Sequence, residues 1–132
     1  MASIFTRIMK GEIPCHKVAE NEEFFAFLDI SPLAPGHTLV IPRSETDYLF
    51  DIDDQVLARM IVFSKKVAIA LEKVVPCKRI GVAVLGLEVP HAHIHLVPLN
   101  REGDISFSKE RVKMSPDELS LLAEKISSEI IW

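Results

Sequence analysis

The sequence predicts one domain that combines α-helices with β-strands, and three observations support this prediction. The chain has 132 residues, which suits a single domain that buries roughly two-thirds of its unfolded surface. Several short apolar runs, bounded by proline, glycine or acidic residues, are typical of strands. Two longer segments repeat apolar residues with the period of an α-helix. We therefore expect a single domain over residues 1–132, which needs neither a metal nor a disulfide to fold.

The first part of the chain predicts a short helix followed by three strands. Ser3 suits the N-cap of this helix, and Gly11 suits the position that ends it. Residues 29–36 contain two prolines and a glycine, so we expect a loop there. The predicted strands cover residues 16–19, 24–28 and 37–42.

The second part predicts a long helix, two strands and a final helix. Asp51 or Asp53 can cap the long helix, which we place at residues 53–75 because Pro76 cannot continue it. The segment Ser115–Glu118 has the pattern of a capping box with proline at the first helical position, so a helix begins there. The two strands are expected at residues 79–85 and 91–98, and residues 100–113 are expected to be polar and irregular.

The long helix has an unusually wide apolar face. At 100° per residue its apolar side chains cover about half of the circumference, whereas one core needs a stripe of roughly 100°. One side of this face would pack on the sheet, and the rest needs a partner. We therefore expect a homodimer, with Phe63 and Val67 in its interface.

Composition limits the class of protein. The net charge is −4, with Lys and Arg dispersed along the chain, which argues against a long nucleic acid as partner. We find no apolar run of 18 residues and no secretory leader, so we expect no membrane association and a cytoplasmic location. Cys15 and Cys77 are read as reduced thiols.

Three of the five histidines alternate in one short stretch, at His91, His93 and His95. In a strand, alternate side chains share a face and lie roughly 6.5 to 7 Å apart. The three imidazoles would then line a cleft and reach one phosphate-sized group. The residues that would face the core are Ala92, Ile94 and Leu96. Alternating strand histidines also suit a transition-metal site, because imidazole is the commonest metal ligand.

Together with its neighbours, this stretch resembles the histidine triad superfamily, and in particular its Hint-like branch. The triad His91-x-His93-x-His95 is followed by two apolar residues, as in the family signature. Residues 3–5, 11–14, 27–30 and 35–42 are also similar to this branch. The resemblance implies an α+β fold with a five-stranded antiparallel sheet, a long helix and a C-terminal helix. It also implies a homodimer, no cofactor, and a purine nucleotide site.

The resemblance assigns a role to each matching residue. His93 would be the nucleophile that forms a nucleotidyl-histidine intermediate. His91 and His95 would flank the phosphate as donors, and His95 would protonate the leaving group. His37 would orient the triad, and Asp29 would bind the ribose hydroxyls. The matching apolar base pocket is Ile4, Phe5, Ile8, Phe27 and Ile30.

The chain departs from the Hint-like pattern at positions that relatives use around the α-phosphate. An asparagine and a Gln-Ser or Gln-Thr pair are replaced by Ile80, Leu87 and Glu88. Two donors become aliphatic, and Glu88 places an acid in the nucleotide site. Some relatives hold a structural zinc with two cysteines and a histidine, and those places are taken by Ser3, Thr6 and Glu45. We therefore expect no metal.

The resemblance predicts a hydrolase or transferase that cleaves purine nucleotide conjugates at the α-phosphate. Phosphoramidates, aminoacyl-adenylates and dinucleoside polyphosphates all fit this description. The first alternative is a non-catalytic nucleotide-binding module, and the second is a metal-binding protein that uses the strand histidines.

Overall fold

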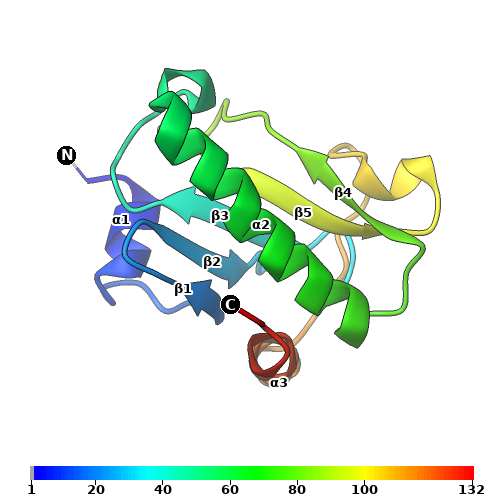
Figure 1. Cartoon of the computed structure of the whole chain (residues 1–132). Coiled ribbons are helices and arrows are strands. Elements are labelled where there is room, and N and C mark those ends of the chain that lie inside the picture. Colours follow the sequence, from blue (N-terminus) through cyan, green and yellow to red (C-terminus); the bar gives the residue numbers. More distant parts are fainter. Residues whose placement is uncertain (1) are drawn as a thin grey trace.

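The structure, a computed structural model, describes residues 2–132 and has the predicted α+β architecture (Figure 1). The α-helices are α1 (Ile4–Met9), α2 (Asp54–Val74) and α3 (Pro116–Ser128). The strands are β1 (Lys17–Glu20), β2 (Phe24–Leu28), β3 (Thr38–Pro42), β4 (Arg79–Ala83) and β5 (Ile94–Leu99). Two 3₁₀-helices, η1 (Leu49–Asp51) and η2 (Glu102–Ile105), lie in connections. No helix within residues 2–132 is both long and apolar enough to cross a membrane.

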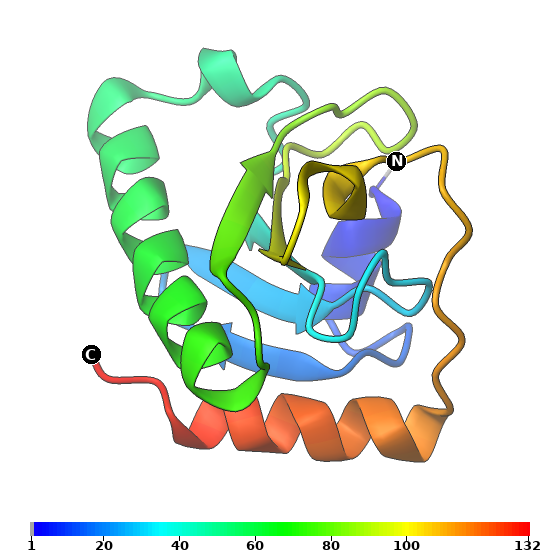
Figure 2. The same ribbon diagram turned by 90° about the vertical axis from the view of Figure 1, so that its right-hand side faces the viewer.

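The five strands form one antiparallel sheet in the order β1-β2-β3-β5-β4. Helix α2 lies across one face of this sheet, and α3 packs against α2 and β1. The view turned by 90° shows α1 on the opposite side of the sheet from α2 (Figure 2). The central strands β2 and β3 are buried along their whole length, because helices or loops cover both of their faces.

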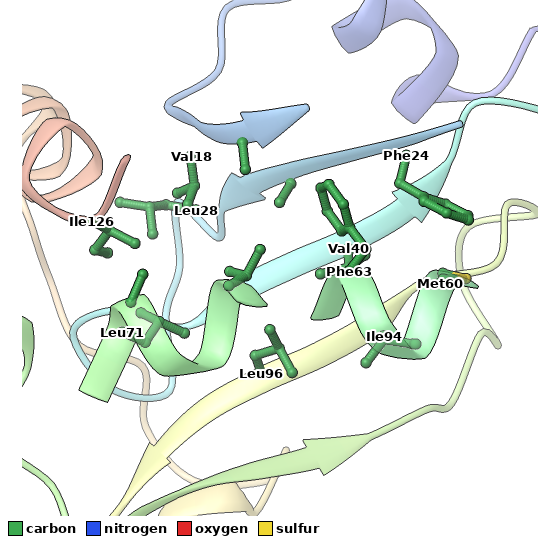
Figure 3. Close-up of a cluster of buried hydrophobic side chains, with 14 of the residues drawn as sticks. Val18, Phe24, Leu28, Val40, Met60, Phe63, Leu71, Ile94, Leu96 and Ile126 are labelled. Atoms are coloured by element: carbon green, nitrogen blue, oxygen red, sulfur yellow. The ribbon is translucent and has the colours of Figure 1, made fainter. Parts of the chain in front are cut away.

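Two apolar clusters lie on the two faces of the sheet. The larger one is formed by the sheet, α2 and α3 (Figure 3). The smaller one lies beneath α1 and includes Phe5, Phe25 and Phe27. Alternate residues of β2 go to the two clusters, since Phe24 and Leu28 belong to the larger one. An uninterrupted apolar strand in the sequence is thus explained by burial on both faces.

The predicted helix starts are confirmed by their caps. The Ser3 hydroxyl accepts a hydrogen bond from the Thr6 backbone N–H at the start of α1. Of the two candidate caps for α2, Asp53 occupies the N-cap position and Asp51 lies in η1. Ser115 forms the predicted capping box at the start of α3.

The histidine stretch differs from its prediction at its first residues. Only Ile94–Leu99 is paired as β5, so His91 and His93 precede the strand. The pairing with β3 begins at Val40 and Ile94, and Ala92 instead donates a backbone hydrogen bond to Thr46 O in a neighbouring loop. The predicted separation into two faces is confirmed for Ala92 and Ile94, which lie in the α2 cluster, and for His93 and His95, which line a cavity on the α1 side, whereas His91 is buried outside that lining.

The position of Phe63 and Val67 in a dimer interface was predicted wrongly. Both side chains are buried in the core that α2 shares with its own sheet. The large apolar residues that α2 exposes are Ile61, Val62 and Ile69. The wide apolar face therefore divides into a core side and an outer side, as helical geometry requires, but the outer side consists of other residues.

Candidate functional site

A cavity of about 450 Å³ lies on the α1 side of the sheet. Its walls come from α1, β2, β3, the 85–89 loop and the 106–113 segment, together with His93 just before β5 and His95 within it. All five predicted base-pocket residues line it, namely Ile4, Phe5, Ile8, Phe27 and Ile30. The polar and charged lining includes Asp29, Glu88, His93, His95 and Arg111. The fold thus brings most of the predicted site residues together around one cavity.

Local hydrogen bonding sets the tautomer of His93. Its Nδ1 atom lies 2.8 Å from the backbone oxygen of His91. A carbonyl oxygen only accepts hydrogen bonds, so Nδ1 carries the proton and donates it. In the neutral ring Nε2 then holds the unshared electron pair. The ring is largely buried and stands edge-on to Phe5, with 5.1 Å between ring centroids, so its orientation is fixed.

A chain of three groups sets the opposite tautomer in His95. The backbone N–H of Leu33 donates to His37 Nδ1 at 3.0 Å, so the proton of neutral His37 is on Nε2. His37 Nε2 lies 2.9 Å from His95 Nδ1 and therefore donates to it. The proton of neutral His95 is consequently on Nε2. The cavity is thus lined by one imidazole with a free electron pair on Nε2 and one with an N–H at the same atom.

His91 has a different position from the one expected of a phosphate donor. It is fully buried and is not part of the cavity lining. Its Nε2–H donates to Pro42 O at 2.8 Å, and its Nδ1 accepts from the Ser3 hydroxyl at 2.7 Å. Both ring nitrogens are therefore engaged within the protein. The expected donor role does not fit this geometry, and His91 instead ties the start of α1 to β3.

Glu45 holds the same end of α1 from outside. Its carboxylate accepts hydrogen bonds from the Ser3 backbone N–H and from the Thr6 hydroxyl, the latter at 2.8 Å. These contacts, the Ser3 N–H first, lower the pKa of Glu45 to about 2. The three residues at the place where some relatives hold zinc are thus bonded to one another, and serine and threonine hydroxyls are poor zinc ligands.

Ile80 lies away from the phosphate-contact position at which it was expected. It is in β4, packed against the α2-side core, and does not line the cavity. Leu87 and Glu88 do line it, from an exposed loop, and Leu87 is 89% exposed. Of the three departures from the family pattern, only the two in the 85–89 loop therefore bear on the site.

Asp29 lies between the cavity and the hydrogen-bonded relay formed by Leu33 N–H, His37 and His95. Its Oδ1 accepts the Ser31 backbone N–H at 2.8 Å, and its Oδ2 lies 3.8 Å from His37 Nε2. Burial raises the pKa of Asp29, while the Ser31 N–H and the nearby Arg111 act in the lowering direction. A carboxylate oxygen beside the cavity suits the expected contact with ribose hydroxyls, which remains a prediction.

Within residues 2–132, one group of side chains could converge on a metal ion, namely Asp29, His37 and His95. Ligand atoms of Asp29, His37 and His95 lie within 4.8 Å of one another. A metal here needs the Nε2 electron pair of His37, yet the Leu33 N–H directed at Nδ1 requires the His37 proton to be on Nε2. Metal binding would leave a buried N–H without an acceptor, which costs about 1–3 kcal/mol. The geometry favours a hydrogen-bonded relay over a metal ligand set.

Two residues of the site were missed by the sequence interpretation, because residues 100–113 were read only as a polar segment. The ring of Phe107 stands edge-on to His95, with 4.7 Å between centroids. Arg111 places its guanidinium carbon 5.6 Å from the centre of the Phe107 ring. The sequence did contain one indication, because a phenylalanine stands alone in the polar stretch that follows the triad. A large aromatic side chain in such a stretch indicates that it packs against the rest of the protein.

The histidines of the relay are neutral over the physiological range. Burial, with Arg111 as a secondary cause, lowers the pKa of His37 to about 4. Burial and then the neighbouring His37 lower the pKa of His95 to about 3. The tautomers described above for His37 and His95 are therefore their relevant protonation states near pH 7.

These pKa shifts predict that the protein loses stability as the pH falls from 6.5 to 5. In the unfolded chain both histidines take up protons near pH 6.5, whereas in the folded protein they stay neutral until about pH 4 and 3. The unfolded state binds more protons in this window, so acid favours unfolding, with a slope approaching about 1.4 kcal/mol per pH unit for each histidine. Urea unfolding at pH 5.0, 5.75, 6.5 and 7.5 measures this slope. A free energy of unfolding that stays level would contradict it.

Comparisons with known proteins identify the family of this chain. The HIT domain family model matches residues 10–102. The adenosine 5'-monophosphoramidase hnt1 of Schizosaccharomyces pombe is 37% identical over 133 residues, covering 98% of this chain and 99% of that protein. A HIT-like protein from Bartonella henselae, described as involved in cell-cycle regulation, has a TM-score of 0.82 at 31% identity, with 97% of this chain and 96% of that one covered.

A second solved structure is also similar over nearly the whole chain. A zinc-bound histidine triad family protein from Mycobacterium smegmatis has a TM-score of 0.80 at 29% identity and covers 98% of this chain and 93% of its own. Both the family model and the full-length relative span most of the chain, so the chain belongs to the HIT family, whose homologues support a nucleotide hydrolase at the family level.

Proposed function

We propose that this protein cleaves purine nucleotide conjugates at the α-phosphate through a nucleotidyl-His93 intermediate, with phosphoramidates as the first substrate class to test. The observation that carries this proposal is the opposite tautomer of the two cavity histidines. His93 has an electron pair at Nε2, and His95 has an N–H at the same atom. A nucleophile and a hydrogen-bond donor are the two groups that displacement at phosphorus requires. The adenosine 5'-monophosphoramidase relative supports the choice of substrate.

The proposed first step is attack of His93 Nε2 on the α-phosphorus. A nitrogen–phosphorus bond forms, and the bond from phosphorus to the leaving atom breaks, so that the leaving atom keeps the electron pair. The His95 Nε2–H donates a hydrogen bond to this atom as its negative charge develops, and an amine leaving group takes its proton from water. The Nδ1–H of His93 remains bonded to the His91 oxygen, so the positive charge of the nucleotidylated ring is stabilised.

The second step returns the enzyme to its starting state. Water attacks the phosphorus, its proton neutralises the hydroxide left when water protonated the amine or is released to solvent, and the nitrogen–phosphorus bond breaks. The electron pair returns to His93 Nε2, and the products are a nucleoside monophosphate and the free leaving group. Asp29 would hold the ribose, and the apolar side of the cavity would hold the base.

The experiment that tests this proposal mixes the protein with adenosine phosphoramidate. Steady turnover, together with a nucleotidyl adduct mapped to His93 after rapid acid quenching, supports the enzyme. Nucleotide binding without turnover supports the alternative of a non-catalytic module. One observation supports this alternative: Leu87 and Glu88 of the 85–89 loop line the cavity. The resemblance to the Hint-like branch implies uncharged polar donors at these two positions.

We also propose a homodimer that forms through the outer face of α2. The residues Ile61, Val62 and Ile69 are each more than 40% exposed there, and Val62 and Ile69 are seven residues apart, so they share one side of the helix. We expect V62E/I69E to halve the molar mass measured by light scattering at micromolar concentration while the far-UV circular dichroism stays unchanged. A wild-type protein that is already monomeric would remove this proposal. Substitutions at Phe63 or Val67 are unsuitable, because they would disrupt the core of the protomer.

A further inference from the structure

The charges around the cavity are few and unequal. Two acids, Asp29 and Glu88, line it together with Arg111, which is the one lysine or arginine in its lining within residues 2–132. The chemistry proposed above assigns no role to this cation. The α-phosphate would lie at His93 and His95, and the ribose would be held by Asp29. A guanidinium beside an anion-binding cavity therefore calls for a separate explanation.

Arg111 is held in place by its own segment and by the loop before β3. The Val112 backbone N–H donates to Pro32 O at 2.9 Å, and Arg111 Nη1 donates to Ser31 O at 2.8 Å. The guanidinium also lies over the Phe107 ring. Backbone, carbonyl and aromatic contacts together fix the direction of the side chain. The orange segment in Figure 2 shows the path of this part of the chain across the α1 side of the fold.

The contact with Asp29 accounts for only part of the guanidinium. Arg111 Nη1 lies 4.0 Å from Asp29 Oδ2, the outer limit of an ion pair, and the Arg111 side chain is 37% exposed. A guanidinium has five N–H donors in a planar fork, and its hydrogen bond to Ser31 O uses one of them. Several donors are thus left for a ligand. A fork of this kind matches the two oxygens of a phosphate or carboxylate.

We propose that Arg111 binds a second anionic group of the substrate, a phosphate or carboxylate carried in addition to the α-phosphate. This inference rests on the proposed function and narrows its substrate class. Arg111 lies beside Asp29, which is proposed to bind the ribose. Phe107, the ring beneath its guanidinium, lies beside His95, which is proposed to donate to the leaving group. The second anion can therefore be carried by the leaving group or by the ribose, and the test separates these two sources.

The test measures binding of three nucleotides by isothermal titration calorimetry. AMP has only the α-phosphate, ADP adds an anion on the leaving-group side, and adenosine 3',5'-bisphosphate adds one on the ribose. We expect wild type to prefer one of the two doubly phosphorylated ligands over AMP. The affinity of R111Q for that ligand should be at least about tenfold lower than that of wild type, because a charge-assisted hydrogen bond contributes about 1.5–3 kcal/mol. AMP affinity should change by less than about threefold.

Three further variants define the result. R111K keeps the charge and loses the fork, so its preference should lie between those of wild type and R111Q. K109Q removes one positive charge from the same segment at a residue outside the cavity lining, and should leave the preference intact. E88Q removes a negative charge from the cavity lining and should raise the affinity for all three nucleotides by a similar factor. R111K also serves if R111Q fails to fold, which thermal melts would reveal.

The outcomes separate this inference from the proposed function. If wild type binds AMP but shows no preference for a second anion, the Arg111 proposal is overturned and the hydrolase proposal stands. An equal loss for all three ligands in R111Q overturns it too, because Arg111 would then act on a part of the nucleotide that all three ligands share. If AMP does not bind at all, both proposals fail. A selective loss for ADP or for the bisphosphate supports the proposal and identifies where the second anion lies.

Discussion

Substitution of His93 by alanine is expected to abolish turnover of adenosine phosphoramidate, with a loss of at least about 10⁴-fold, as for other covalent nucleophiles. Nε2 of this ring is the nitrogen whose electron pair is free near the phosphate, since Nδ1 donates to the His91 oxygen. Alanine leaves no group that could form the covalent intermediate. The measurements are the steady-state rate and a mass-spectrometric search for the nucleotidyl adduct.

Binding and folding should survive in this variant. His93 is mostly enclosed by the cavity and by Phe5, and the residues that pack the α2-side core at this stretch are Ala92, Ile94 and Leu96. AMP affinity and the melting temperature should therefore remain close to those of wild type. His16 offers a matched control, because it lies outside the cavity lining and contacts Ser120, so H16A should retain full activity. Undiminished turnover in H93A, with contaminating activity excluded, would remove His93 as the nucleophile.

Features set by local sequence could be predicted well. Helix starts depend on one capping side chain and its neighbours, and those at Ser3, Asp53 and Ser115 are observed. The period of two in the histidine stretch correctly separated Ala92 and Ile94 in the core from His93 and His95 at the cavity. The five-stranded sheet followed from the family resemblance, since the order of strands depends on long-range pairing that composition does not reveal.

Features set by long-range contacts could not be predicted from spacing. His91 shares the alternation of His93 and His95, yet Ser3 and Pro42 engage both of its nitrogens from distant parts of the chain. Arg111 reaches the cavity because the 106–113 segment is bonded to the loop that contains Ser31 and Pro32. Neither contact leaves a local pattern in the sequence.

The division of the α2 apolar face was beyond prediction for a related reason. Periodicity gives the width of an apolar face but not which part of it meets the sheet. The packing of β2 and β5 selects Phe63 and Val67 for the core, and this leaves Ile61, Val62 and Ile69 outside. The protonation of the relay is similar, because a single backbone N–H at Leu33 decides which atom of His37, and hence of His95, carries the proton.

The second large loss of activity is expected when His95, the last residue of this relay, is replaced by alanine. The His95 Nε2–H would donate to the leaving atom, and removing one transition-state donor costs about 10²–10³-fold in rate. This loss should depend on the substrate. An alkylamine leaving group develops more charge in need of stabilisation than a nitrophenolate, which disperses its own charge. We therefore expect the full loss with the alkylamine phosphoramidate and a much smaller one with the nitrophenyl ester.

The measurement is kcat/KM for both substrates in wild type, H95A and H95Q. Glutamine keeps an N–H donor near the position of the imidazole, so H95Q should recover part of the alkylamine rate, while its nitrophenyl rate changes little. Because the pKa of His95 is held near 3, its donor state does not change between pH 6 and 8, and the ratio of the two losses should be level across that range. Equal losses for the two substrates in H95A would show that His95 stabilises the phosphoryl oxygens rather than the leaving group.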